Sequence, residues 1–531
     1  MIGITLKDFL PAINLFGEFK TSVSKRFLLG LLLVAAIPRF WIAWQPIEVL
    51  VTKNLPDDAF FYFVLARNVV SLGSASLDGI NATNGFHPLW LIALLPIFGT
   101  GSIQGELPIH LALSLASLFD LLSIFLLGRL GASLLRDWRL GLAAGAVYAF
   151  NPVVVLQVTN GLETSLGILT LMVFLVVYRD WLRSITHLGK SVSTGILGGL
   201  MFLARTDSIF LFGLSMLAAL WLWKKRQALL SVTIVLLTSL LTVSPWLIWS
   251  QLNVGSIFQD SGYAIPLVLQ GQVNAQHGNG VLPLIVESLR QLGSPASWLR
   301  GDFTGLPLLV GAIAWLAILI PLIRRWNTNP DRLERALFFP SFLACALLII
   351  VHAGLRWYAR AWYFIPCSAV FALAYALALQ SGIAKWGHRL FASSLLIIYF
   401  WLTGILFWNA GYYPWQTVMW RAGQWVTENL NTNERVASFI NSGMLAYTNS
   451  PQVTNADGLI NHHALEAIKR HSLLAYLKEQ GVTYLIDADG PIWGLYAPFM
   501  GEGFPESLHE VHTLGFLNEG LGFLRVYRIE K

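Results

Sequence analysis

Residues 27–68 join an apolar run, FLLGLLLVAAIPRFWIAW at 27–44, to a segment that opens with acidic residues, LPDDAFFYFVLARN at 55–68. The first stretch approaches the roughly 20 apolar residues that a helix needs to cross a membrane. Its polar lead, which carries Lys20, Lys25 and Arg26, is longer than that of a cleaved signal peptide. We therefore expect a retained first membrane span, with the acidic pair Asp57-Asp58 just beyond it.

The same apolar pattern recurs along most of the chain. Of its 531 residues 55% are hydrophobic and only 12% are charged, whereas a soluble globular protein has about 25% charged residues. The run 86–103 contains two prolines and two glycines, which weaken a straight helix, so it is expected to dip in or lie obliquely. The other runs predict a polytopic α-helical membrane protein with about 11 transmembrane helices, at 27–45, 108–128, 139–158, 164–182, 194–206, 208–223, 229–250, 306–323, 336–352, 362–380 and 390–408.

Basic residues indicate the sidedness, because short loops rich in Lys and Arg usually face the cytoplasm. This places residues 1–26 inside, and it places the loops 46–85 and 251–305 outside with everything after residue 409. Residues 411–531 hold 8 Lys and Arg against 12 Asp and Glu, so the basic excess belongs to the membrane part. No basic stripe lies on a polar domain, which makes nucleic-acid binding a poor explanation of the net charge of +6.

The chain after the transmembrane domain (27–410) predicts a small α/β domain at 411–531. Its pattern favours helices at Trp415–Leu430 and His463–Gln480, and strands at Arg435–Ile440, Val482–Asp487 and Phe523–Ile529. The outer loop 251–305 is long for a connection without a function and carries a possible short helix at 282–292. Such a loop is expected to fold over a bound substrate, although an inert interfacial helix fits the same pattern.

The acidic pair has two interpretations. Carboxylates are favoured at a helix N-terminus, and Pro56 is suited to open a helix, so Asp57 and Asp58 fit a simple capping role. Alternatively, the pair lies beside the apolar, aromatic segment 59–70, where two adjacent carboxylates repel and the pKa of one is expected to rise. A carboxyl group of this kind suits a general base or a metal ligand.

A second stretch, DGINATNGFHPLW at 78–90, is rich in turns and runs directly into an apolar helix. Together with PDDAF at 56–60, it resembles the GT-C fold glycosyltransferases that use polyprenyl-phosphate-linked sugars, such as protein mannosyltransferases, aminoarabinose lipid A transferases and arabinofuranosyltransferases. These enzymes carry an acidic pair or a single carboxylate in the first outer loop. Three further matches are NGLET at 160–164, GGLMFLARTD at 198–207 and NADGL at 455–459, the last resembling the outer domain of uncharacterised bacterial relatives.

The resemblance implies a hexosyl- or pentosyltransferase of a bacterial-type cytoplasmic membrane, with its active site and C-terminus extracytoplasmic. It implies a polyprenyl-phosphate sugar donor, a glycan, lipid or protein acceptor, and inversion at the sugar. Asp57 or Asp58 is the expected base, and Glu163 matches the position of a second functional carboxylate. Oxygen ligands of this kind fit Mg or Mn, but some relatives need no metal, so metal dependence stays open.

Arg205, Arg356 and Arg360 are expected on the outer side, against the positive-inside trend. Charged groups bordering a membrane are functional candidates, and a guanidinium suits a phosphate. Pairing of these arginines with Asp207, Glu163 or a lipid head group is the alternative, and Asp207 is itself a candidate substrate-binding residue. His87 suits a phosphate or metal, but an interfacial aromatic role fits it at least as well.

Two other functions compete with sugar transfer. A transporter or flippase of lipid-linked saccharides is expected to show inverted repeats with broken helices in both halves, and the sequence shows no such symmetry. A non-catalytic scaffold in envelope assembly would use residues 411–531 for binding. The sequence identifies neither the sugar nor the acceptor, and it does not distinguish Asp57 from Asp58 as the base.

Overall fold

The computed structural model describes residues 19–99, 105–223, 226–278, 280–291, 331–380, 411–449 and 452–530, with isolated positions between 393 and 409. The predicted span 306–323 lies outside the described residues, and only isolated positions of the predicted span 390–408 lie within them.

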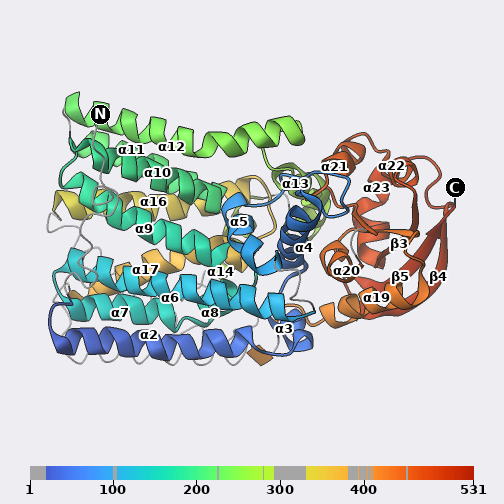
Figure 1. The fold of residues 1–531 in the computed structure, drawn as a ribbon, viewed down its shortest axis with the longest axis horizontal. Coiled ribbons are helices and arrows are strands. Elements are labelled where there is room, and N and C mark those ends of the chain that lie inside the picture. The colour runs from blue at the N-terminus through green and yellow to red at the C-terminus, as the bar shows by residue number, and fades with distance from the viewer. Residues whose placement is uncertain are drawn as a thin grey trace.

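The protein is a polytopic α-helical membrane protein. Figure 1 shows its long helices running side by side. Six described spans are long and apolar enough to cross a membrane: α2 (Ser22–Ala43), α6 (Leu107–Leu135), α9 (Thr164–Leu182), α12 (Arg226–Asn253), α16 (Arg332–Gly354), and the short helix η3 (Ala361–Phe364) with α17 (Ile365–Gln380).

Three other apolar stretches that were predicted as spans differ from a single long helix. The stretch 139–158 forms α7 (Trp138–Ala149) and α8 (Pro152–Val158), bent by 66° at the break. Asn151 caps α8 and Pro152 follows it, and proline at this position cannot continue the preceding helix. The other two stretches form α10 (Leu188–Ala204) and α11 (Ile209–Leu222), which are shorter apolar helices joined by the turn η1 (Thr206–Ser208).

Five shorter helices accompany the membrane bundle. They are α3 (Ile47–Lys53), α4 (Asp57–Leu72), α5 (Pro88–Phe98), α13 (Ser261–His277) and α14 (Leu282–Gln291). Helix α5 has 11 residues, which is too few to cross a hydrocarbon core that needs about 20. Helix α4 begins directly after Pro56 and ends at Gly73, whose φ of 71° suits a residue without a side chain.

The C-terminal domain is the predicted α/β unit. Its sheet has the order β2-β1-β3-β5-β4, in which β1 runs parallel to β2 and β3, and β5 runs antiparallel to β3 and β4. The elements are α19 (Gln416–Asn429), β1 (Arg435–Ser438), α20 (Ser442–Asn449), β2 (Val453–Asn455), α21 (His462–Lys469), α22 (Leu473–Glu479), β3 (Val482–Ala488), η4 (Gly490–Tyr496), α23 (Ala497–Met500), β4 (Leu508–Asn518) and β5 (Gly522–Ile529).

One sequence prediction in this domain is wrong. The expected helix His463–Gln480 is two helices, α21 and α22, because the chain turns at His471, which has a φ of 54°. The pattern also missed β2, which has three residues, and β4, which lies at the sheet edge. Three predicted strands, Arg435–Ile440, Val482–Asp487 and Phe523–Ile529, are confirmed by β1, β3 and β5.

A single apolar core joins the C-terminal domain to the outer helices. It includes Phe60 and Phe63 of α4, Met444 and Leu445 of α20, and Ile486 of β3. In Figure 1, α4 and α20 lie between the membrane bundle and the sheet. The domain therefore packs directly on the segment that follows Asp57-Asp58.

An ion pair lies wholly inside the membrane bundle. The Nε atom of Arg39 on α2 lies 2.6 Å from Oδ2 of Asp120 on α6, and both side chains are fully buried. The hydroxyl of Tyr148 donates to the other Asp120 oxygen at 2.8 Å. Because an unpaired charge is costly in a membrane, this contact fixes how α2, α6 and α7 pack.

Candidate functional site

A cavity of about 310 Å³ lies where the membrane helices meet the C-terminal domain. Its polar lining comes from α4, the segment before α5, the start of α9, the α10–α11 turn and α16. The cavity brings together five predicted site residues, Asp58, His87, Glu163, Arg205 and Asp207, with Tyr62, His352 and Tyr363 beside them.

The two aspartates of the acidic pair lie in different surroundings. Asp57 is 6% exposed, and its carboxylate accepts N–H bonds from Gly443 (2.9 Å) and Met444 (2.8 Å) at the start of α20. Asp58 is partly exposed and lines the cavity. Asp57 therefore caps a helix, as one interpretation suggested, but the helix belongs to the C-terminal domain.

The surroundings of Asp58 affect its proton affinity. Burial raises the pKa of the Asp58 carboxyl above its ordinary value, and nearby Glu163 raises it further, while the charge of Arg360 lowers the pKa. Burial likewise raises the pKa of Asp57, against the N–H groups of Met444 and Gly443. No other described residue donates a hydrogen bond to the Asp58 carboxylate, which leaves its oxygens available to a molecule in the cavity.

Glu163, Arg205 and Asp207 form a buried ionic network on one wall. Arg205 Nη1 donates to Glu163 Oε1 at 2.7 Å, and Nη2 donates to Asp207 Oδ2 at 2.6 Å. Glu163 stands at the N-cap of α9 and Arg205 at the C-cap of α10, so two helix ends meet here. Gly167 makes room for this arginine, because a Cβ at that position would lie 2.5 Å from Arg205 Cδ. The structure thus pairs Arg205 as the alternative interpretation suggested, and Arg205 also lines the cavity.

Tyr62 and His87 extend this network toward the first outer loop. The Tyr62 hydroxyl donates to Glu163 Oε2 at 2.9 Å and accepts from the His87 backbone N–H at 3.0 Å. His87 Nε2 lies 3.6 Å from Glu163 Oε1. Burial lowers the pKa of His87, which favours the neutral ring. Its buried Nδ1 has no hydrogen-bond partner among the described residues.

Arg360 and Arg356 do not line the cavity. The Arg360 guanidinium lies over the rings of Tyr358 (4.5 Å) and Trp362 (5.8 Å), close enough to Asp58 to lower its pKa. Arg356 has a φ of 57° and donates from Nη2 to the carbonyl oxygen of Gly278 at 2.6 Å. It thereby ties α13 to the connection between α16 and η3.

A second, smaller and mainly apolar cavity adjoins the first. Arg205, Asp207 and Phe210 line both. The remaining lining of the second cavity comes from α9, α11, α16 and α17, among them Leu171 and Leu348. A polar space beside the C-terminal domain thus adjoins an apolar space between membrane helices.

Several cavity residues were not singled out from the sequence. His352 belongs to α16. Leu459 and Ile460 come from the C-terminal domain, and Gln259 comes from the connection between α12 and α13. Two sequence signals pointed to them: the NADGL match at 455–459 includes Leu459, and the outer loop 251–305, expected to fold over a substrate, includes Gln259. Across the described ranges, no group of three or more His, Cys, Asp or Glu side chains is arranged to hold a metal ion.

Known proteins resemble this chain in fold rather than in sequence. A family model described as a domain of unknown function (DUF8728) matches residues 408–525, and no curated protein matches the sequence. An Archaeoglobus fulgidus oligosaccharyltransferase tethered to an acceptor peptide matches 97% of this chain and 74% of its own, with a TM-score of 0.58 and 14% identity. ArnT from Cupriavidus metallidurans, bound to undecaprenyl phosphate, matches 94% of this chain and 97% of its own, with a TM-score of 0.56 and 12% identity.

The chain has the GT-C fold. A further structure with this fold is the archaeal oligosaccharyltransferase AglB from Archaeoglobus fulgidus in complex with an inhibitory peptide and a dolichol-phosphate. It matches 95% of this chain and 74% of its own, with a TM-score of 0.52 and 13% identity. At these identities the similarity concerns the fold. The fold predicted from the two sequence stretches in the first outer segment is therefore confirmed.

Proposed function

We propose that this protein is a membrane glycosyltransferase that moves a sugar from a polyprenyl-phosphate-linked donor to an acceptor hydroxyl on the extracytoplasmic side. One observation carries the proposal: the cavity that presents Asp58 adjoins an apolar cavity between membrane helices, with Arg205 lining both. This arrangement suits a substrate with a sugar, an anionic phosphate and a long apolar chain in that order. The solved relatives add support, since one is bound to undecaprenyl phosphate and another to a dolichol-phosphate.

Asp58 is the proposed general base. The proton of the acceptor hydroxyl passes to the Asp58 carboxylate while the hydroxyl oxygen forms a bond to the anomeric carbon. The bond between that carbon and the phosphate oxygen breaks, and its electron pair stays on the phosphate. Attack from the side opposite the leaving group inverts the sugar. A positioned base typically contributes about 10²- to 10⁴-fold in rate.

Positive charge beside the phosphate stabilises the leaving group. Arg205 supplies it in this proposal, and Arg360, which does not line the cavity, adds its charge from beside Asp58. Two carboxylates hold Arg205 in place, and no described carboxylate forms an ion pair with Arg360, whose guanidinium lies over aromatic rings. Glu163 orients its neighbours, because it bonds to both Tyr62 and Arg205. These steps use the chain's own groups.

The substrates can be identified by deleting the gene and profiling the glycolipids and envelope glycans of the deletion strain. The proposal expects a lipid-linked sugar to accumulate and a glycan, lipid or protein to lack that sugar. Adding the accumulated lipid to purified protein in liposomes, together with the under-glycosylated acceptor, should restore transfer. An unchanged envelope, or a lipid that the protein moves across the bilayer without transferring its sugar, would contradict the proposal.

A further inference from the structure

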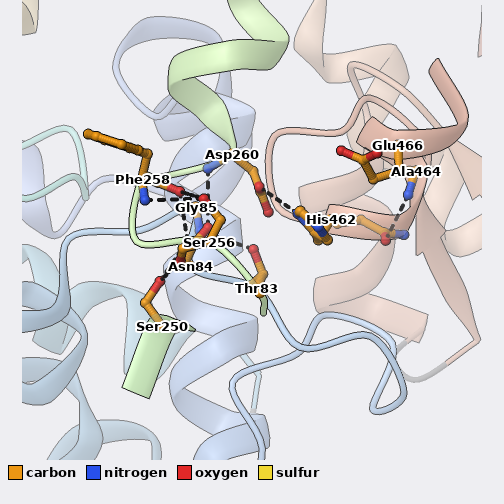
Figure 2. A network of polar contacts seen from close by, with 12 residues as sticks. Thr83, Asn84, Gly85, Ser250, Ser256, Phe258, Asp260, His462, Ala464 and Glu466 are labelled. Carbon is orange, nitrogen blue, oxygen red and sulfur yellow. Dashed lines mark hydrogen bonds and ion pairs between the residues drawn. The ribbon is translucent and has the colours of Figure 1, made fainter. Parts of the chain in front are cut away.

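An ion pair joins the connection between α12 and α13 to the C-terminal domain. Asp260 precedes α13, and its Oδ1 lies 2.8 Å from Nδ1 of His462, the first residue of α21 (Figure 2). The Asp260 side chain is 1% exposed and that of His462 is 22% exposed. Glu466 and Lys469 of α21 also act electrostatically on this carboxylate. Neither Asp260 nor His462 has a part in the proposed transfer.

Asn84 attaches the same connection to the first outer loop. Its Nδ2 donates to Ser250 Oγ and to the carbonyl oxygens of Ser256 and Phe258, at 2.7, 3.0 and 2.8 Å. Its Oδ1 accepts from the backbone N–H of Asp260 at 3.1 Å. Figure 2 shows these contacts as one continuous network that ends at His462. Three segments far apart in the sequence are therefore held together.

The joined segments form one side of the cavity. Gln259, Ser261 and Ile265 line it from the α12–α13 side, and Leu459 and Ile460 line it from the C-terminal domain. Gln259 is itself held, because its Nε2 donates to the carbonyl oxygen of Phe86 at 2.7 Å.

The first outer loop and the domain are in close contact at the same place. Gly85 lies against the carbonyl oxygen of Leu459, and a Cβ at this glycine would overlap that oxygen. The wall of the cavity thus depends on how these backbones are placed.

We propose that Asp260 and His462 are positioning residues, whose ion pair holds α13 against the C-terminal domain so that both close the outer side of the transfer site. The region that matches a domain of unknown function then has a defined role in this chain: its loop 456–461 supplies a wall of the site, and His462 fastens the wall to α13. The consequence for sugar transfer rests on the proposed function, whereas the contact itself does not.

The contact between Asp260 and His462 is tested by the accessibility of a thiol placed in the cavity wall. In a background without Cys345 and Cys367, a single thiol is introduced by Ser261→Cys, and its rate of reaction with a bulky polar maleimide is measured on the purified protein. His462→Ala removes the donor of the contact and Asp260→Asn removes the charge of its acceptor, and weakening a hydrogen bond to a buried carboxylate is expected to raise the labelling rate about tenfold or more. His463→Ala is the matched control, because the neighbouring histidine is exposed.

The conservative variant His462→Asn retains a donor close to the position of Nδ1 and should restore most of the slow labelling. Equal labelling rates in His462→Ala, Asp260→Asn and His463→Ala would overturn the proposal. If His462→Ala fails to fold, Asp260→Asn and His462→Asn still report on the contact.

Sugar transfer by the same variants separates the two proposals. The ion pair should support kcat/KM, which is expected to fall about tenfold in His462→Ala and Asp260→Asn and to stay unchanged in His463→Ala, with a larger change in KM than in kcat. Faster labelling together with unaltered transfer would refute the positioning role. Faster labelling in a protein whose wild type transfers no sugar from any polyprenyl-phosphate donor would refute the proposed function and leave the contact established.

Discussion

Replacing Asp57 by Asn should loosen the attachment of the C-terminal domain without removing any group from the cavity. The carboxylate accepts two N–H bonds from the start of α20, one on each oxygen. An asparagine offers one acceptor oxygen, so its NH2 group faces the second N–H. A buried donor left without a partner costs about 1–3 kcal/mol, and the lost interaction with the helix dipole adds about 0.3–1 kcal/mol where the carboxyl is ionised.

A total of about 2 kcal/mol is therefore expected for the local opening of α20. Since about 1.4 kcal/mol corresponds to a factor of ten, hydrogen exchange of the α20 amides should become roughly 30-fold faster. The matched control is Asp58→Asn. This variant removes a carboxylate from the adjacent residue, and the Asp58 side chain bonds to no α20 amide. Its α20 exchange should equal that of the wild type.

The measurement compares exchange in peptides covering Ser442–Asn449 in the wild type and both variants. Exchange that is unchanged in Asp57→Asn, or equally fast in both variants, would refute the assignment of Asp57 to the domain contact. The Gly443 and Met444 amides should show the largest change because they donate the two bonds.

Two further predictions concern the cavity itself. Arg360 lowers the pKa of Asp58, so Arg360→Gln should raise that pKa. Because the base acts unprotonated, the acidic limb of the pH profile of kcat/KM should move to higher pH. A limb that stays in place or moves to lower pH would argue against an interaction between Arg360 and the base. Gly167→Ala places a methyl group against the Arg205 side chain and should reduce kcat/KM about tenfold or more, since misplacing a positioned group costs up to about 100-fold. In the control Gly213→Ala, nothing lies within 4 Å of the added carbon, so wild-type activity should be retained. Equal activities of the two variants would contradict a positioning role for Gly167.

Much of the fold follows from local sequence. Runs of apolar residues predicted the long membrane helices, because a hydrocarbon core demands length and composition that are visible in one segment. The strands β1, β3 and β5 were also predicted, since their apolar residues lie in short compact runs. The two strands that escaped prediction are short or lie at an edge: β2 has three residues, and β4 exposes most of its side chains. The break at His471 depends on one residue in a left-handed conformation within an otherwise helical pattern.

The candidate site likewise has features that local sequence predicts and features that it does not. Asp58, His87, Glu163, Arg205 and Asp207 were chosen because each stands out within its own stretch of sequence, and the structure gathers them around one cavity. The different surroundings of Asp57 were not predictable, because its partners Gly443 and Met444 lie 386 and 387 residues away. The contact between Asp260 and His462 spans 202 residues and likewise has no local signature.

The proposed mechanism has Asp58 take the acceptor proton in a polyprenyl-phosphate-dependent sugar transfer. Its most direct test is single-turnover transfer by Asp58→Asn in liposomes that contain the lipid-linked donor and the acceptor. With Asp58 as the base, the rate should lie about 10²- to 10⁴-fold below wild type, with α20 exchange unchanged and donor still bound. Transfer at the wild-type rate by Asp58→Asn would contradict it.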